Sequence, residues 1–178
     1  MRELCCFALA LVLLGCGSND DDGGGGGAPG GSCDSAGTSP AAFECKIVEL
    51  VNQHRAAGAT CGGNAMPPVG KLTMHSTLRA TARAHAADMA QKGYFAHDNL
   101  EGKSPFDRMS EAGYQWSTAG ENIAAGSPTP EGAMDQWMKS PGHCANIMKA
   151  EFEDIGVGYA AQDGSKFTHY WVQNFGAQ

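Results

Sequence analysis

The first pattern in the chain is helical. From residue 41 onward, apolar side chains recur every three or four positions, which is the spacing of one face of an α-helix. Ile47, Leu50, Val51 and His54 share such a face, and Gly58 follows as a terminating residue. We therefore predict a helix over about residues 40–57.

A second long helix is predicted after residue 75. Ser76 is a candidate N-cap and Gly93 closes the periodic stretch. His75 stands just before this helix, where it can help to cap it. One face of the helix is formed by Leu78, Ala82, His85 and Met89.

Three shorter helices are predicted further along the chain, over residues 104–114, 129–140 and 140–149. The first of them has Ser104 as a cap and Pro105 at its first helical position, where proline is favoured because its nitrogen has no hydrogen to leave unpaired.

The period changes near the end of the chain. Ile155, Val157 and Tyr159 alternate with glycines, and a β-rich run from Phe167 to Phe175 follows. The pair Asp163-Gly164 between the two runs is typical of a hairpin turn. Helices followed by strands predict an α+β domain in which helices pack on an antiparallel sheet.

The N-terminus predicts export. Residues 1–15 carry Arg2 and then a short apolar run, which has the form of a secretory signal peptide. The signal ends in Gly15-Cys16, which resembles a bacterial lipobox, so we expect Cys16 to be lipidated; an ordinary cleaved signal is the alternative. Residues 16–40 are rich in glycine and predict a flexible tether between the lipid and the domain.

The net charge and the hydropathy of the chain limit the kinds of partner that we expect it to bind. The formal net charge is −7, whereas a nucleic-acid partner requires a basic face, so we expect no nucleic-acid binding. No apolar run reaches the length of a transmembrane helix. An acidic surface on a long tether suits a monomer that lies in the cell envelope, at the outer membrane if the organism has two membranes.

Four cysteines remain after the signal and Cys16, and an even number in an exported chain predicts two disulfides. Four cysteines allow three pairings, of which we expect Cys61–Cys144 and Cys33–Cys45. A thiolate metal site is disfavoured because the two-residue spacing between cysteines that such sites use is missing.

Three side chains stand out as candidates for chemistry. His97 lies in a polar loop directly after the second long helix, and Glu121 is a lone carboxylate among small residues. His143 falls in the first turn of a helix that begins after Ser140 and Pro141, where the helix dipole disfavours protonation. A neutral imidazole is what a metal ligand or a general base requires. The histidines at 54, 75 and 85 suit structural roles, and His169 stays open.

Five motifs in register, YFAHDN, AGENIA, WMKSPGHCANIM, IGVGY and YWVQNFG, resemble the CAP superfamily of cysteine-rich secretory, antigen 5 and pathogenesis-related 1 proteins, also called the SCP domain. The resemblance is to the bacterial branch and covers residues 43–176. It implies an α-β-α sandwich with a three- or four-stranded antiparallel sheet between helical layers.

The resemblance also implies a cleft lined by two histidines and two acidic residues. His97, Glu121 and His143 match three of these positions. The second glutamate has no counterpart here, because Lys139 and Ser140 follow the helix tryptophan Trp137.

Two functions and one structural alternative follow from these residues. We expect a binding domain whose cleft holds a lipid, glycan or peptide, with Zn²⁺ or another divalent cation held by His97 and His143, with Glu121 as a further ligand. The alternative function is a metal-dependent hydrolase that uses the same three residues, since two histidines and a glutamate are a ligand set of catalytic zinc. The three side chains can also form a hydrogen-bonded cluster that only orders the cleft wall. We favour binding because no serine or thiol nucleophile is evident.

Overall fold

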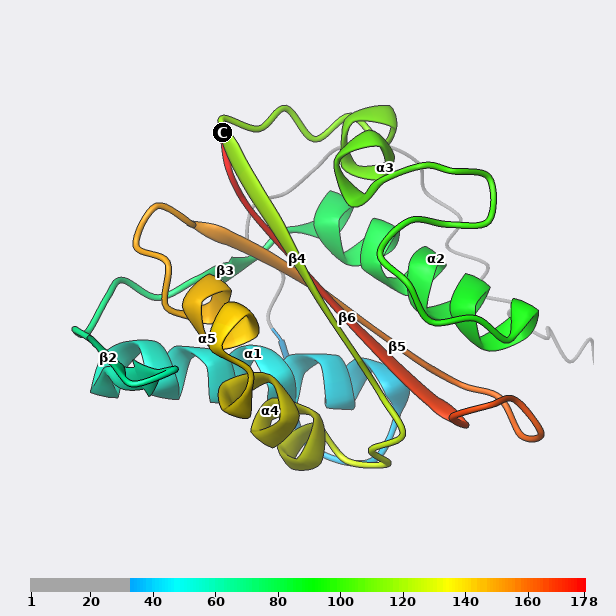
Figure 1. Ribbon diagram of the computed structural model, residues 1–178, viewed down its shortest axis with the longest axis horizontal. Helices are drawn as coiled ribbons and strands as arrows, with labels where there is room; N and C mark the ends of the chain where they lie inside the picture. The colour runs from blue at the N-terminus through cyan, green and yellow to red at the C-terminus, as the bar shows by residue number, and fades with distance from the viewer. Residues whose placement is uncertain (1–32) are drawn as a thin grey trace, which may run out of the picture.

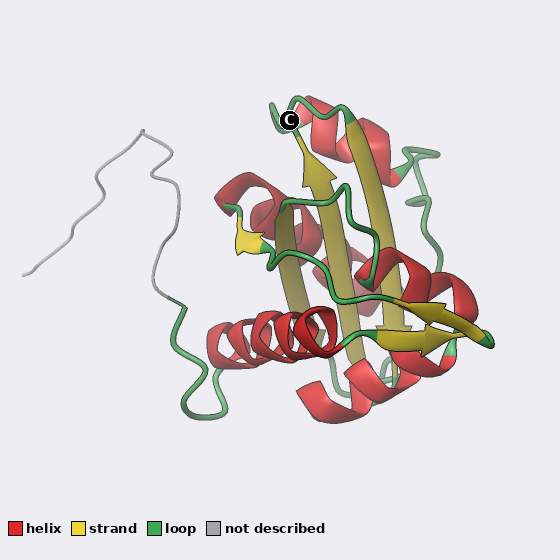
Figure 2. Ribbon diagram, turned by 90° about the vertical axis from the view of Figure 1, so that its left-hand side faces the viewer, coloured by secondary structure: helices red, strands yellow, loops and turns green. Residues whose placement is uncertain are grey.

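The computed structural model describes residues 33–178, so the predicted signal peptide, the lipidated Cys16 and most of the tether lie outside the described residues. A four-stranded sheet stands between two layers of helices (Figure 1). Helices α1, α4 and α5 cover one face, and α2 and α3 cover the other (Figure 2). This is the α+β sandwich that the sequence predicts. Among residues 33–178, no helix combines the length and the apolar character that crossing a membrane requires.

The two long helices form where the hydrophobic periodicity predicts them. Helix α1 spans Pro40–Ala57 and is capped by Ser39, and α2 spans Ser76–Lys92 and ends at Gly93 in the left-handed conformation. The predicted cap of α2 is wrong by one residue: Ser76 is already helical, and the Nδ1 of His75 accepts the hydrogen bond from the Thr77 amide.

The three short helices also form, each somewhat shorter than its predicted range. Helix α3 spans Pro105–Glu111 and begins with a capping box between Ser104 and Asp107. Helices α4, Pro130–Lys139, and α5, Pro141–Ile147, meet at Ser140. Ser140 occupies the N-cap position of α5, but its hydroxyl makes no capping hydrogen bond.

The sheet has the strand order β3-β5-β6-β4. Strands β5, Asp154–Ala161, and β6, His169–Ala177, form the predicted antiparallel hairpin. Strand β4, Thr118–Ala125, pairs antiparallel with β6 and forms one edge of the sheet. The short β3, Thr73–Met74, pairs with β5 and is parallel, which departs from the all-antiparallel expectation.

A separate two-stranded hairpin follows α1. It consists of β1, Ala59–Cys61, and β2, Asn64–Met66. Both predicted disulfides are present: Cys61–Cys144 joins β1 to α5, and Cys33–Cys45 joins the start of the described chain to α1. The last part of the predicted tether is therefore bound covalently to the domain.

Glycines on β5 set the distance between the sheet and α2. A Cβ added to Gly156 or Gly158 would collide with backbone atoms of Leu78 or Ala82 in α2. The neighbours Ile155 and Val157 point to the opposite face and are fully buried against the layer that contains α1. The alternation of glycine and apolar residues thus gives one close-packed face and one apolar face.

A buried arginine fixes the segment that follows α5. The side chain of Arg55 donates to the backbone carbonyls of Gly70, Ile147, Lys149 and Phe152, at 2.5 to 3.3 Å. Arg55 is 1% exposed, and its charge is compensated by carbonyl dipoles. This contact holds the end of α5 against α1, and α5 carries His143.

Candidate functional site

The candidate site lies along β4, the edge strand, where both layers of helices reach the rim of the sheet (Figure 1). Successive residues of a strand point to opposite faces. Ile123 packs with the cluster of α2, and its neighbour Ala124 packs with the cluster of α4 and α5. Successive residues of β4 therefore face the two helix layers alternately.

Glu121 is the centre of the site. Its side chain is 1% exposed, and both carboxylate oxygens have partners. The Nδ1 of His97 lies 2.8 Å from Oε1, and Nη2 of Arg108 donates to Oε2 at 2.7 Å. The structure thus brings His97 and Glu121 into direct contact from positions 24 residues apart in the chain.

Arg108 is a site residue that the sequence analysis missed. It lies on α3 and binds Glu121, and its Nη1 also donates to the carbonyls of His97 and Lys103 at 2.8 and 3.0 Å. It therefore holds both the carboxylate and the backbone of the loop that carries the histidine. Its position on a short polar helix gives no signal of this role, because its partners are distant in sequence.

The loop that carries His97 is fixed at both ends. The Nε2 of His85 bonds the carbonyl of Ala96 at 2.9 Å, and the side chain of Asn99 accepts from the amides of Glu101 and Lys103. The side chain of His97 remains 49% exposed. Its Nδ1 is bound to Glu121, and its Nε2 makes no hydrogen bond to any residue among 33–178.

His143 approaches from the other layer. Its carbonyl accepts from the side-chain amide of Asn122, the neighbour of Glu121, at 3.1 Å. Asn122 also bonds Gln173 and Asn146, at 3.0 and 2.9 Å, so α5 is tied to two strands of the sheet. The disulfide through Cys144 adds a covalent link next to the imidazole.

The pKa of His143 is lowered from its ordinary value, as predicted, but for a different reason. Burial of the imidazole is the main cause, and the positive charge that His97 can carry is the second. Both disfavour the imidazolium. His143 therefore stays neutral more readily than a free histidine, and its lone pair is available to a ligand.

A pocket of about 280 Å³ opens beside His143. It straddles β4 and is lined by Phe95, Ile123, Ala124, Ala125, Gln136, Trp137, Ser140, His143 and Phe167. Trp137 is completely buried, and its indole Nε1 has no hydrogen-bond partner among the described residues. Neither His97 nor Glu121 lines this pocket, because Glu121 is covered and His97 lies in the adjoining loop.

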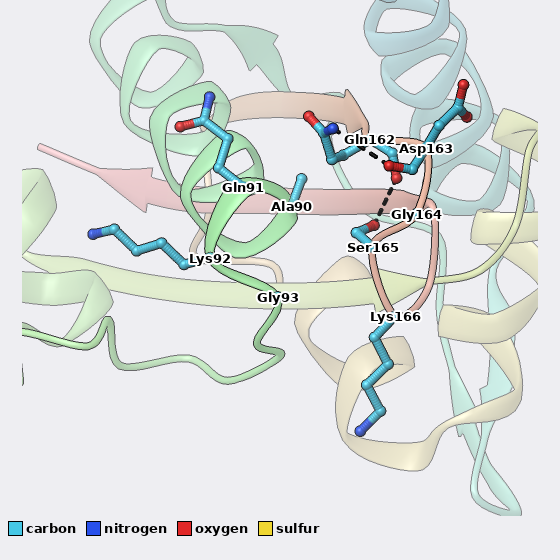
Figure 3. Close-up of a pocket in the computed structure, with 9 residues that line it drawn as sticks. All are labelled: Ala90, Gln91, Lys92, Gly93, Gln162, Asp163, Gly164, Ser165 and Lys166. Atoms are coloured by element: carbon cyan, nitrogen blue, oxygen red, sulfur yellow. Dashed lines mark hydrogen bonds between the residues drawn. The ribbon is translucent and has the colours of Figure 1, made fainter.

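A larger pocket of about 430 Å³ lies away from these residues, between the end of α2 and the turn that joins β5 to β6 (Figure 3). Its polar side chains include Gln91, Lys92 and Lys166, which are exposed. The hydroxyl of Ser165 is bonded to the carbonyl of Gln162 within the turn. Because no buried polar group faces this pocket, we assign no chemistry to it.

The described residues form no closed metal centre. Among residues 33–178, no three His, Cys, Asp or Glu side chains gather closely enough to hold one ion. Glu121 has both oxygens engaged, which leaves His97 and His143 as the candidate ligands. Hydrogen bonding of Nδ1 to a carboxylate is the usual arrangement for a histidine that binds metal through Nε2.

Three of the other histidines, at positions 75, 85 and 169, have structural partners. His75 caps α2, and His85 bonds Ala96, as described above. His169, which the sequence left open, lies at the start of β6 with its Nδ1 2.8 Å from the hydroxyl of Tyr159. It lies outside the set of contacts around Glu121.

Comparison with known proteins gives consistent matches. Residues 48–175 match the family model of CAP, the cysteine-rich secretory protein family. The uncharacterized protein YkwD of Bacillus subtilis (strain 168) is 42% identical over 141 residues, which cover 79% of this chain and 49% of that protein. The chain thus spans about half the length of this curated relative.

Two solved structures share the fold. An extracellular protein with an SCP domain from Bacillus anthracis has a TM-score of 0.62 at 26% identity, covering 75% of this chain and 39% of that chain. An outer surface protein from Borrelia burgdorferi has a TM-score of 0.59 at 19% identity, covering 75% of this chain and 87% of that chain.

Proposed function

The chain belongs to the cysteine-rich secretory protein (CAP) family, and on that premise we propose that it is a binding domain that works outside the cytoplasm. Its ligand has an apolar part, which enters the pocket beside Trp137, and a polar part, which meets His143 and His97. Among the ligand classes considered above, this description suits a lipid or an apolar peptide better than a glycan.

The observation that carries the proposal is the arrangement around Glu121. A buried carboxylate that only ordered the wall would need one cationic partner, and Arg108 supplies it. Glu121 also holds the ring of a half-exposed histidine, so that the other ring nitrogen is free to meet a ligand. Fixing an exposed polar group in one orientation costs side-chain entropy and is typical of binding sites.

The pocket supports the apolar part of the proposal. Phe95, Phe167 and Ile123 supply apolar surface, and Phe95 and Phe167 pack edge to face with centroids 5.6 Å apart. Phe95 stays 40% exposed, so this pair has surface left to cover. The unpartnered Nε1 of Trp137 is a donor that an acceptor atom of the ligand would satisfy.

A divalent cation is the second element of the proposal. Zn²⁺ would be held by one nitrogen each of His97 and His143, with water completing the coordination, and it would supply a positive centre for an anionic ligand group. Because only two protein groups would coordinate the ion, we expect Zn²⁺ to bind weakly. Calorimetry should detect heat from Zn²⁺ with the wild type and lose it in the His97→Ala/His143→Ala variant; equal heats would exclude this site.

Hydrolysis through a serine or cysteine nucleophile is not favoured by the contacts. Cys144 is bonded to Cys61 and is therefore not a nucleophile. Ser140 lines the pocket, but its hydroxyl makes no hydrogen bond to an imidazole within residues 33–178. An activated serine requires such a base within hydrogen-bonding distance.

The proposed location rests on export chemistry. Disulfides persist in oxidising compartments, and the domain contains two. We propose that Cys16 carries the lipid that anchors the chain to the cell envelope. Metabolic labelling with a clickable fatty acid should mark the wild type, whereas Cys16→Ser should abolish the label; a labelled Cys16→Ser chain would contradict the anchor.

The binding function can be tested with a fluorescent fatty acid, dansylundecanoate. Saturable enhancement of its emission is expected with the wild type, and Phe95→Ser should weaken the affinity at least tenfold. Phe106→Ser is a matched control, because Phe106 on α3 is 41% exposed and pairs with Trp116 instead of lining the pocket. Equal loss in both variants, or no saturable binding, would contradict the proposal.

A further inference from the structure

A second pocket adjoins Arg108. Its volume is about 250 Å³, and it lies between α2 and the loop that leads into α3. Helix α2 contributes Ala84, His85 and Asp88 to its wall, and the loop contributes Asn99 and Glu101. The pocket that contains His143 shares none of these residues.

Two buried nitrogen atoms, on residues that line this pocket, have no partner among the described residues. One is the Nδ1 of His85, a residue that is 1% exposed, and the other is the Nε of Arg108. The Nε2 of His85 must carry hydrogen, because the carbonyl of Ala96 that it contacts can only accept. Burial lowers the pKa of His85 and favours the neutral ring, so Nδ1 is an acceptor without a donor.

The two unpartnered atoms have complementary needs. The Nε–H of Arg108 requires an acceptor, whereas the Nδ1 of His85 requires a donor. Buried polar atoms in folded proteins nearly always have partners, so a pair of exceptions on one wall calls for an explanation. A hydroxyl group both accepts and donates, and it is the simplest chemical group that can serve both atoms.

The charges along this wall favour a neutral ligand over an anionic one. Asp88 is engaged by Lys92 at 2.7 Å and by the hydroxyl of Tyr94, and the terminal nitrogens of Arg108 are engaged by Glu121 and by carbonyls. Apart from the Nε–H of Arg108, no cationic group of the wall is therefore free to bind an anion. Glu101 has no ion-pair partner among residues 33–178, and its carboxylate would repel an anionic ligand.

We propose that this pocket binds a neutral, polyhydroxylated ligand of about the size of one sugar ring. One hydroxyl enters between His85 and Arg108, and others reach the Nδ2 of Asn99 and the carboxylate of Glu101. The Oδ1 of Asn99 is already occupied by two backbone amides, so only its amide nitrogen is free to donate. The volume is below the roughly 300–1,000 Å³ of sites for drug-sized ligands, which fits a small ligand. The proposal does not depend on the function proposed for His97 and His143.

The test uses the full chain, isotopically labelled, with glucose as the neutral probe and glucuronate as its anionic counterpart. Glucose should shift the amide signals of Ala84, Asn99 and Glu101 saturably in ¹H–¹⁵N spectra, with a dissociation constant on the order of 1 mM. Glucuronate should bind at least fivefold more weakly. Shifts that never saturate, or tighter binding of glucuronate, would overturn the proposal.

Two matched substitutions locate the binding. Ala84→Phe fills the pocket from an exposed position of α2 and should weaken glucose binding at least tenfold. Ala80, one turn earlier on α2, is also exposed and lies outside the pocket wall, so Ala80→Phe should change the affinity less than twofold. Asn99→Asp keeps the acceptor of the loop but removes the free donor, and it should also weaken binding. Equal affinities of the Ala84→Phe and Ala80→Phe chains would refute the site.

Discussion

Arg108→Met removes the guanidinium that neutralises Glu121. The carboxylate is 1% exposed, and its remaining partner, His97, is half exposed. Removing one partner of a buried ion pair costs about 3–5 kcal/mol, because the other charge stays buried without compensation. We expect Arg108→Met to lower the free energy of unfolding by about 4 kcal/mol, because methionine replaces the aliphatic part of the arginine side chain but leaves the carboxylate of Glu121 without its cation.

Glu121→Gln leaves the opposite charge. The guanidinium of Arg108 is 11% exposed and keeps the carbonyls of His97 and Lys103 as acceptors. The expected cost is therefore smaller, about 3 kcal/mol. The double variant contains neither charge, so it should lose about 4 kcal/mol, which gives a coupling energy of about 3 kcal/mol, at the upper end for residues in contact.

Urea unfolding with the disulfides intact measures these free energies by linear extrapolation. A domain with 5–15 kcal/mol of stability remains folded in each single variant under native conditions. Losses that add to about 7 kcal/mol in the double variant, with coupling below about 0.5 kcal/mol, would refute the pairing of Arg108 with Glu121.

Three further predictions follow from the same structure. Burial lowers the pKa of His143 in the folded state. Just below about pH 6.5, therefore, only the unfolded chain takes up a proton at this residue. The stability is thus retained above that pH and falls as the pH drops towards the folded-state pKa. His143→Gln should flatten this fall in urea melts at a series of pH values, and an unchanged slope would contradict the assignment. Replacing Cys61 and Cys144 by alanine opens a loop with a sequence separation of 83 and should cost about 4.5 kcal/mol in the chain-entropy model; an unchanged urea midpoint would contradict this. Gly158→Ala places a methyl group against the backbone of α2 and should lower the free energy of unfolding by about 3 kcal/mol, as measured by calorimetry. Gly164→Ala is the control, because a Cβ in this exposed turn meets no atom and introduces only the strain of a positive φ. Equal costs of the two substitutions would contradict the packing effect at Gly158.

The helices were predictable because their signals are local. Proline at the first position and serine or threonine before it mark the starts of α3 and α4, and the apolar stripe of α2 is buried as its spacing predicts. The exception on α1 is informative. The predicted face includes His54, which is only partly buried, whereas the neighbouring Arg55 is buried because four carbonyls from distant segments surround it.

Strand β4 was not predictable from its own residues. The segment 118–125 contains alanine, glycine and a single β-branched apolar residue, Ile123, which is a weak strand signal. It forms a strand because β6 supplies eight paired positions along its length. Tertiary context overrides local propensity here.

The candidate site was predicted in part. The family motifs pointed to His97, Glu121 and His143, and the contact between His97 and Glu121 agrees with a shared location. The role of Arg108 was not foreseen, because an arginine on a short polar helix normally faces solvent. Its burial arises from a carboxylate 13 residues away, which no local pattern reveals.

The central claim is that His97, oriented by Glu121, and His143 face one common ligand position. The most direct measurement is a Zn²⁺ titration followed by ¹H–¹⁵N correlation of the imidazole nitrogens. The ring signals of His97 and His143 should shift together and saturate at one equivalent, and Glu121→Gln should weaken this response about 10- to 100-fold, as loss of a hydrogen-bond partner of a metal ligand does. Rings that respond at different Zn²⁺ concentrations, or a response of His97 alone, would contradict the shared site.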